Sequence, residues 1–202
     1  MQPEKARTQT ILAGVLVFSA IFVFMISEQT NLVQLFDQPV QTDNTQLKGV
    51  FTITVRDGDG NILSIQQMPN LVPNEGLECT ADLMFGTTSC TAEAFFQYIA
   101  IGTGAVAPAD GDTTLGAESG TCARVLDATP TLTSPSSGVR RIALSAVFSG
   151  ATCEAQTFAE TGVFDALTSG NMLARTLLSS TVTLPSGTGS TLTINYEVNL
   201  NN

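Results

Sequence analysis

The hydrophobic pattern of the chain changes once, close to residue 49, from a helical period to a period of two. Before this point, residues 11–26 form a run of 16 without a charged side chain. Apolar residues then continue at helical spacing up to Phe36, and Pro39 ends the pattern. We therefore expect one long hydrophobic α-helix within residues 1–37, soluble in lipid over its first half and amphipathic over its second.

Three interpretations fit this N-terminal segment. Lys5 and Arg7 precede the apolar run and acidic residues follow it, so an uncleaved membrane anchor would keep its N-terminus in the cytoplasm and export the rest. A cleaved signal peptide fits less well, because no small-x-small cleavage site follows the run. In the third interpretation the segment is a pilin-like assembly helix, since residues 7–10 (RTQT) loosely resemble the processing site of archaeal pilin and archaellin precursors.

The amphipathic half favours assembly over simple anchoring. Large apolar side chains beyond the membrane surface would each forgo about 1.5–3 kcal/mol of burial unless another surface covered them. We expect the helix to leave the membrane and to pack with the same helix of neighbouring subunits. Residues expected along this assembly helix are Ile11, Val15, Phe18, Phe22, Leu32, Leu35 and Phe36.

The remainder of the chain is expected to form a β-sandwich after a polar linker at residues 38–48. From residue 49 apolar and polar side chains alternate, most regularly over residues 192–200, and Gly, Pro, Ser and Asp clusters separate the stretches. The pattern predicts a mainly β domain over residues 49–202, an antiparallel sandwich of the Ig-like or jelly-roll type with about eight strands. The expected strands are 51–55, 62–68, 95–102, 122–127, 141–148, 155–164, 172–184 and 192–200.

One short helix is expected at residues 74–85, capped by Asn74 and closed by Gly86. Four cysteines follow the apolar segment, and in an oxidising compartment they predict two disulfides. Of the three connectivities we favour Cys79–Cys90, which closes a short loop, and Cys122–Cys153, which joins two strands. The alternative is four reduced thiols in the cytosol.

Composition excludes several functions. The 202 residues carry a formal net charge of −10 and contain no His. Without His there is no Ser-His-Asp or Cys-His nucleophile and no His-ligated metal, and the cysteine spacing does not fit zinc. The acidic balance argues against nucleic acid as a partner. We expect no catalytic residue, no metal site and no cofactor.

Candidate chemical motifs are weak. Residues 57–61 (DGDGN) have the opening spacing of an EF-hand loop, but Ile62 and Met68 occupy the required Gly and Glu positions. A hairpin turn is the favoured interpretation, with weak calcium binding as the alternative. Asp110 and Asp112 are expected to lie in a structural loop.

Two further motifs are expected to be structural. Residues 102–104 (GTG) lack the third glycine of a dinucleotide fingerprint and are interpreted as the exit of a strand. The arginines at 124, 140, 141 and 175 are expected to pair with carboxylates, within the subunit or across a contact.

The signatures in the second half resemble those of a known group of proteins. They are residues 70–72, 76–77, 98–104, 107–108, Asp112, Leu115, Glu118, Arg124, 160–164 and 170–175, together with the final alternating strand. These stretches, within about residues 49–200, resemble small β-sandwich structural proteins of tailed-virus fibres and of archaeal surfaces. The resemblance implies a structural or adhesive role and no enzymatic site.

Taken together, these observations predict a non-catalytic structural subunit of an extracellular assembly, either a pilus-like surface filament or a virion appendage. The expected partners are copies of the chain itself and, through the N-terminal helix, a membrane. The expected location is the cell surface, an extracellular filament or a virion. The alternative is a membrane-tethered adhesin that binds a ligand through its Asp-rich and Gly-rich loops.

Overall fold

The computed structural model describes residues 47–201 apart from residues 87–89, 91–94, 138 and 154. The expected N-terminal helix and nearly all of the expected linker lie outside the described residues. Within the described part, no helix is long and apolar enough to cross a membrane.

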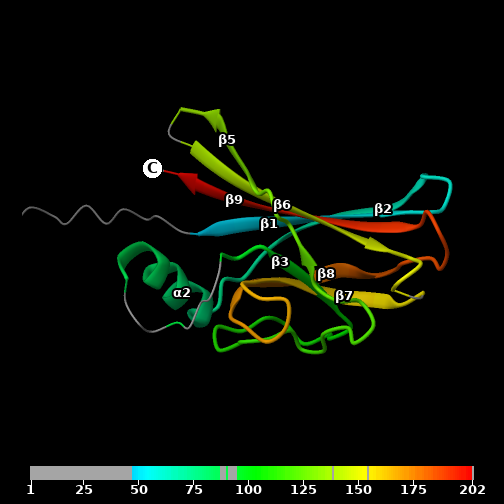
Figure 1. Ribbon diagram of the computed structural model, residues 1–202, viewed down its shortest axis with the longest axis horizontal. Coiled ribbons are helices and arrows are strands. Elements are labelled where there is room, and N and C mark those ends of the chain that lie inside the picture. Colours follow the sequence, from blue (N-terminus) through cyan, green and yellow to red (C-terminus); the bar gives the residue numbers. More distant parts are fainter. Residues whose placement is uncertain (1–46, 87–89, 91–94, 138, 154, 202) are drawn as a thin grey trace, which may run out of the picture. The chain divides into compact units, whose positions relative to one another are not determined.

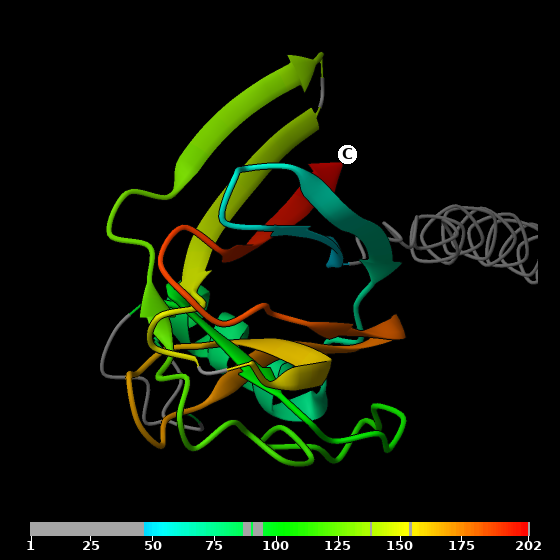
Figure 2. The same cartoon turned by 90° about the vertical axis from the view of Figure 1, so that its right-hand side faces the viewer.

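The described chain is mainly β and antiparallel, and its strands form two facing sheets (Figures 1 and 2). One sheet has five strands in the order β2-β1-β9-β6-β5, and the other has four in the order β4-β3-β7-β8. The strands are β1 (Lys48–Arg56), β2 (Ile62–Pro69), β3 (Tyr98–Gly102), β4 (Val125–Leu126), β5 (Thr131–Ser136), β6 (Val139–Ser149), β7 (Thr157–Phe164), β8 (Met172–Thr183) and β9 (Thr191–Asn201). A single helix in the described residues, α2 (Asn74–Phe85), joins β2 to the segment before β3.

The alternating residues of the central strands form the core, as the period-two pattern predicts. Phe51, Ile53 and Val55 of β1 are each at most 1% exposed, whereas the intervening threonines are partly exposed. β9 lies between β1 and β6 along almost its whole length. Its inward residues therefore pack between two long neighbours, and this strand holds the five-stranded sheet together.

Tyr196 anchors the core to the end of β2. Its ring lies 4.5 Å from that of Phe51, and Asn70 donates to its hydroxyl oxygen at 3.3 Å. Asn70 also accepts a hydrogen bond from the Gly49 N–H at 2.6 Å. A Cβ at Gly49 would come within 2.5 Å of the Tyr196 ring, so glycine is required there for close packing. Burial raises the pKa of Tyr196 well above its usual value.

One side of the sandwich is closed between the outer strands β2 and β8. The Gln66 amide donates to the Ser180 carbonyl at 2.9 Å and accepts from the Ser180 N–H at 3.1 Å. Farther along, the Thr176 hydroxyl donates to the Pro69 carbonyl at 2.8 Å. These polar contacts satisfy part of the free edge of β8, which would otherwise be open to another strand.

The opposite side is closed by Asp127, which follows β4. Its carboxylate accepts a hydrogen bond from the Ser145 N–H on β6 at 2.8 Å. Its backbone N–H donates to the Gln97 carbonyl beside β3 at 2.9 Å. One residue thus connects the two sheets where no strand pairs across them.

Helix α2 begins and ends at the expected residues, but its N-cap differs from the prediction. Pro73 occupies the cap position and Asn74 is the first helical residue, with no side-chain cap bond. Proline fits there because its missing N–H is not needed and its φ is fixed at a suitable value. Gly86 closes the helix in the left-handed conformation (φ 67°), as the sequence predicts, and its N–H donates to the Asp82 carbonyl at 2.8 Å.

The strand predictions fail at two places. β5 was not expected, because its sequence TLTSPS has a single large apolar residue and no regular alternation. The strand expected at 122–127 shrinks to Val125–Leu126, since Arg124 and Cys122 contribute side chains to contacts other than a ladder. In addition, β1 begins at Lys48, which the linker prediction had included.

The four cysteines form two disulfides, Cys79–Cys90 and Cys122–Cys153, which is the connectivity favoured from the sequence. The first joins α2 to the segment that leads to β3. The second joins the connection before β4 to the turn after β6, and both of its cysteines are buried in the main core. The paired cysteines are 11 and 31 residues apart, and each disulfide links segments that the strand pairing leaves separate. The second does not join two strands as expected, because both of its cysteines lie in connections.

We predict that the contact between α2 and β8 tolerates no added methyl group at Gly76. A Cβ there would overlap the Leu173 carbonyl, which is backbone and cannot move aside. Gly76→Ala should lower the free energy of unfolding by about 1–3 kcal/mol in chemical denaturation. Gly120→Ala, where a Cβ would meet nothing within 4 Å, is the matched control and should change it by less than about 0.5 kcal/mol. Equal effects of the two substitutions would contradict the packing argument.

Candidate functional site

Buried charge is concentrated on the four-stranded sheet, where β7 and β8 lie side by side. Glu160 on β7 is completely buried, and Arg175 on β8 is 2% exposed. The Arg175 Nε and Nη2 atoms lie 2.9 and 2.7 Å from Glu160 Oε2. Because a buried charge is tolerated only when it is paired and hydrogen-bonded, each of these side chains requires the other.

Glu160 also fixes the long connection between β3 and β4. Its Oε1 atom accepts hydrogen bonds from the N–H groups of Gly104 (3.0 Å) and Ala117 (2.7 Å), and its Oε2 atom accepts one from Gly116 (3.0 Å). A Cβ at Gly104 would overlap the Glu160 carboxylate. The expected strand exit at residues 102–104 is therefore confirmed, and its glycine allows the backbone to approach a buried carboxylate.

Arg175 contacts the middle of the same connection between β3 and β4. Its Nη1 atom pairs with the Asp112 carboxylate, and its Nη2 atom donates to the Val106 carbonyl at 2.9 Å. Asp112 additionally accepts a hydrogen bond from the Ala109 N–H at 2.9 Å. The carboxylate thus belongs to a structural loop, as the sequence predicts. We call Glu160, Arg175 and Asp112, with the backbone they hold, the ion cluster.

Arg124 forms a second buried centre at the end of the same connection. Its Nε and Nη2 atoms lie 2.7 and 2.8 Å from the two oxygens of Glu118. Its Nη1 atom donates to the carbonyls of Ala166 and Ser169 at 2.9 and 2.6 Å, and its guanidinium lies 3.6 Å from the centre of the Phe164 ring. The planar fork of arginine is suited to several partners at once. Arg124 therefore ties the β3–β4 connection to the turn between β7 and β8.

That turn is stabilised from within by Asp165 and Asn171. The Asp165 carboxylate accepts hydrogen bonds from the backbone N–H of Asn171 at 2.7 Å and from its side-chain amide at 2.6 Å. Ser169 and Gly170 both have positive φ, at 55° and 74°. A Cβ at Gly170 would overlap the Asp165 carboxylate, so the turn requires glycine at this position.

Of the two remaining arginines, one forms a salt bridge within the subunit and the other does not. Arg141 pairs with Glu197 at 3.5 Å on the surface. Arg140 has no salt bridge to a described carboxylate and donates to the carbonyl of its neighbour Val139 at 3.1 Å. Pairing within the subunit is therefore confirmed for Arg124, Arg141 and Arg175, and pairing of Arg140 across a contact stays a prediction.

The DGDGN segment forms the turn of the β1–β2 hairpin. Asp57 accepts hydrogen bonds from the N–H groups of Asp59 and Asn61 and from the Asn61 side-chain amide, and this last bond is the main reason that its pKa is lowered. The described residues contain no group of three or more acidic or cysteine side chains arranged to hold a metal ion. The hairpin-turn interpretation accounts for all of these contacts.

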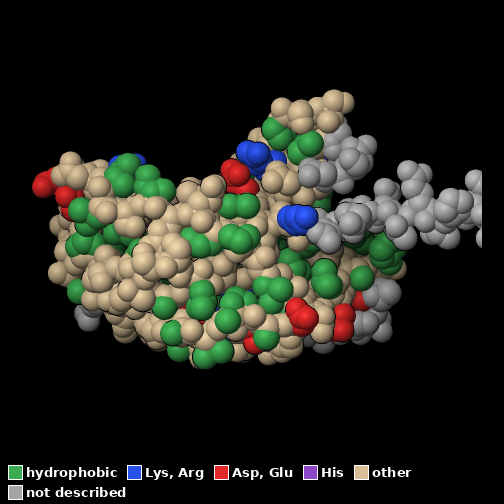
Figure 3. Space-filling model, turned by 180° about the vertical axis from the view of Figure 1, so that it is seen from behind, with side chains coloured by type: hydrophobic (Ala, Val, Ile, Leu, Met, Phe, Trp, Pro, Cys, Tyr) green, Lys and Arg blue, Asp and Glu red, His purple; other side chains and the backbone are tan. Residues whose placement is uncertain are grey.

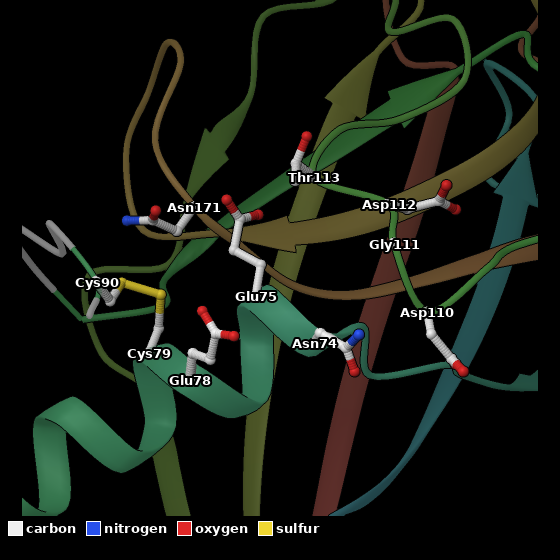
Figure 4. Close-up of a pocket in the computed structure, with 10 residues that line it drawn as sticks. All are labelled: Asn74, Glu75, Glu78, Cys79, Cys90, Asp110, Gly111, Asp112, Thr113 and Asn171. Carbon is white, nitrogen blue, oxygen red and sulfur yellow. A yellow bond between two sulfur atoms is a disulfide. The ribbon is translucent and has the colours of Figure 1, made fainter.

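A shallow pocket of about 240 Å³ lies between α2 and the β3–β4 connection (Figure 4). Figure 4 shows Glu75 and Glu78 rising from α2 beside Asn171, with the disulfide Cys79–Cys90 at one end. Glu75 accepts a hydrogen bond from the Met172 N–H at 2.9 Å. Burial raises the pKa of Glu75, the nearby Asp165 and Glu78 carboxylates add to this rise, and the Met172 bond opposes it.

The geometry of these groups supports a structural role. The charged atoms of the ion cluster and of Arg124 bond to one another and to backbone groups. The sequence placed Glu118 and Glu160 among the signature residues but did not indicate that they pair with Arg124 and Arg175. A signal was present for Glu160, because it is a charged residue inside the apolar strand pattern FAETGVF.

A family model matches more than half of the chain. The family model described as "Podophage GP4 fiber I protein gp80" matches residues 78–197, which are 120 of the 202 residues. No curated protein matches the chain. The matched range extends from α2 into β9 and contains both buried arginines with their carboxylate partners.

We predict that Arg175→Met destabilises the domain by about 3–5 kcal/mol, because it leaves the Glu160 charge buried without a counter-ion. Arg141→Met, which breaks a surface pair whose side chains are more than a third exposed, should cost less than about 1 kcal/mol. Chemical denaturation of both variants measures the two changes. If Arg175→Met were as mild as the control, Glu160 would not depend on this arginine.

A second prediction concerns pH and Glu75. Because folding raises the pKa of this carboxyl, its contribution to stability is greatest below about pH 4 and is lost as the pH rises through the raised value. Glu75→Gln keeps an oxygen that can accept from the Met172 N–H. The variant should therefore be at least as stable as the native chain at pH 7, and this advantage should disappear near pH 4. Thermal unfolding across this range measures the difference, and a variant that is less stable only at neutral pH would reverse the assignment.

Proposed function

Because the chain belongs to the podophage fibre family that its residues 78–197 match, we propose that it is a non-catalytic structural subunit of a virion appendage, assembled from copies of itself. The family match is the observation that carries this proposal. The buried arginine centres are consistent with it, since their salt bridges hold long connections in place.

Surface charge supports an exposed position for the sandwich. Figure 3 shows a face made mostly of uncharged side chains, with a small number of acidic and basic side chains scattered over it. The net charge of −10 of the whole chain favours solubility and discourages unspecific contact. We place the sandwich on the outside of the appendage.

The N-terminal segment is proposed to serve assembly. Its apolar stripe at Ile11, Val15, Phe18, Phe22, Leu32, Leu35 and Phe36 would pack with that of neighbouring subunits. A membrane stage before assembly, as in a pilus-like filament, is part of the same proposal. The family match favours a virion over a cell-surface filament as the final location.

A second candidate function is ligand binding, and one observation favours it. A groove of about 500 Å³ crosses the outer face of the five-stranded sheet, lined by hydroxyl and amide side chains such as Thr52, Gln67 and Asn195. Asp127 and Glu197 add carboxylates at its border. Such a surface would suit a neutral hydroxylated ligand, and titration of the full chain with oligosaccharides would test it.

We predict that purified virions contain the chain. Mass spectrometry of particles should recover peptides from the sandwich, and immunogold labelling with antibodies to it should mark an appendage and not the interior. Absence of the chain from particles at every purification stage would overturn the structural proposal.

For the N-terminal segment, the double substitution Leu35→Ser and Phe36→Ser should prevent assembly while leaving the sandwich folded. Electron microscopy measures assembly, and circular dichroism measures folding. Normal assembly of the double variant would show that this part of the segment does not mediate subunit contact.

A further inference from the structure

Four strands form the outer edges of the two sheets, and three of these edges carry polar contacts or are short within the described residues. The edges of β2 and β8 are joined through the Gln66 amide and through a bridge in which Leu71 and Arg175 exchange two backbone hydrogen bonds of 2.9 Å. β4 has only two residues and is followed at once by the Asp127 contact to β6. The β5 edge has no such contact to the other sheet among the described residues.

The free backbone groups of β5 can be assigned from its neighbour. Ser145 on β6 lies opposite Asn195 of β9, yet its N–H donates to Asp127, so it points away from β9 and toward the β5 side. Backbone groups alternate along a strand, so those of Ala143 and Arg141 also point toward β5. Their partners Thr131 and Thr133 therefore make the ladder, and the N–H and C=O of Leu132 face the open edge.

Leu132 also ends an apolar row on the inner face of the sheet. The register places Leu132 beside Ile142 and Ile142 beside Val198. Exposure rises along this row from 6% at Val198 to 37% at Ile142 and 66% at Leu132. This rise in exposure has a simple cause. The β5–β6 hairpin projects beyond the four-stranded sheet that covers the rest of the inner face (Figures 1 and 2). The row is thus open at the edge where the backbone is also open.

Natural sheets usually protect an edge with charged residues, proline or a bulge. In β5 the proline, Pro135, and the register shift both lie in the second half, and Thr131–Thr133 carry none of these features. The absence of charge is informative about the partner. When a strand pairs with its own copy across a two-fold axis, each charge near the axis meets the same charge, which is destabilising.

We propose that β5 is a self-association edge, at which Leu132 of one copy pairs antiparallel with Leu132 of a second copy across a two-fold axis. The Leu132 N–H of each copy donates to the Leu132 carbonyl of the other, and the two five-stranded sheets become continuous. The apolar rows meet at the axis, so Leu132 and Ile142 of both copies cover one another. This inference rests on the proposed structural function and names the surface that serves it.

The test introduces a charged side chain at the proposed two-fold axis by substituting Leu132 in the full chain. Leu132→Lys and Leu132→Glu should each weaken self-association by about tenfold or more, because like charges then lie opposite each other. An equimolar mixture of the two variants should restore association, since Lys then faces Glu. Leu63→Lys on β2, at a leucine that is 55% exposed, is the matched control and should leave association unchanged. Sedimentation velocity over a concentration series measures all four samples, and circular dichroism confirms that each is folded.

A crosslink reports on the same contact independently of other subunit interfaces. Leu132→Cys should form a covalent dimer on mild oxidation, and Leu63→Cys should not. Association of the native chain that is indifferent to Leu132→Lys, with no crosslink at position 132, would overturn the β5 contact and leave the proposed function standing. A native chain that stays monomeric at every concentration and is absent from virions would overturn the proposed function, and the β5 contact would fall with it.

Discussion

The buried ion pair between Glu160 and Arg175 is the interaction on which the loop-bearing half of the domain depends. It is made between neighbouring strands, yet most of its hydrogen bonds go outward to backbone groups of the β3–β4 connection. This connection contains 22 residues between Gly102 and Val125 and is far longer than a usual strand connection. The two side chains bind four of its backbone groups, the N–H groups of Gly104, Gly116 and Ala117 and the carbonyl of Val106.

A buried pair of this kind is weak evidence for stability in itself, because removing two charges from water is costly. What the pair provides is a single defined conformation of the β3–β4 connection. The Glu160 carboxylate accepts from three backbone N–H groups, and Arg175 reaches a carboxylate and a carbonyl, so one arrangement of the connection satisfies all of them. Arg124 does the same for the β7–β8 turn. A rigid outer surface is what repeated contact between subunits requires, which links these centres to the proposed structural role.

Much of the fold was predictable because it depends on local patterns. The alternation in β1, β6 and β9 predicts strands since one face must be buried, and Gly86 ends α2 because glycine adopts the left-handed conformation without strain. Pairing of Cys79 with Cys90 was favoured because it closes a short loop, and pairing of Cys122 with Cys153 because it would join two strands. β5 was not predictable in this way, since most of it lies outside the core and its sequence carries no burial pattern.

The sequence by itself determined the mainly β domain, the position of the helix and the absence of histidine chemistry, because each depends on residue type and spacing along the chain. Only the tertiary structure decided which carboxylates meet Arg124 and Arg175, since Glu160 lies 15 residues before Arg175 while Asp112 lies 63 before it. It also decided that β5 lies at an edge of its sheet. Whether an edge is covered depends on contacts such as that of Gln66 with Ser180, 114 residues away, and no local pattern encodes a distance of that kind.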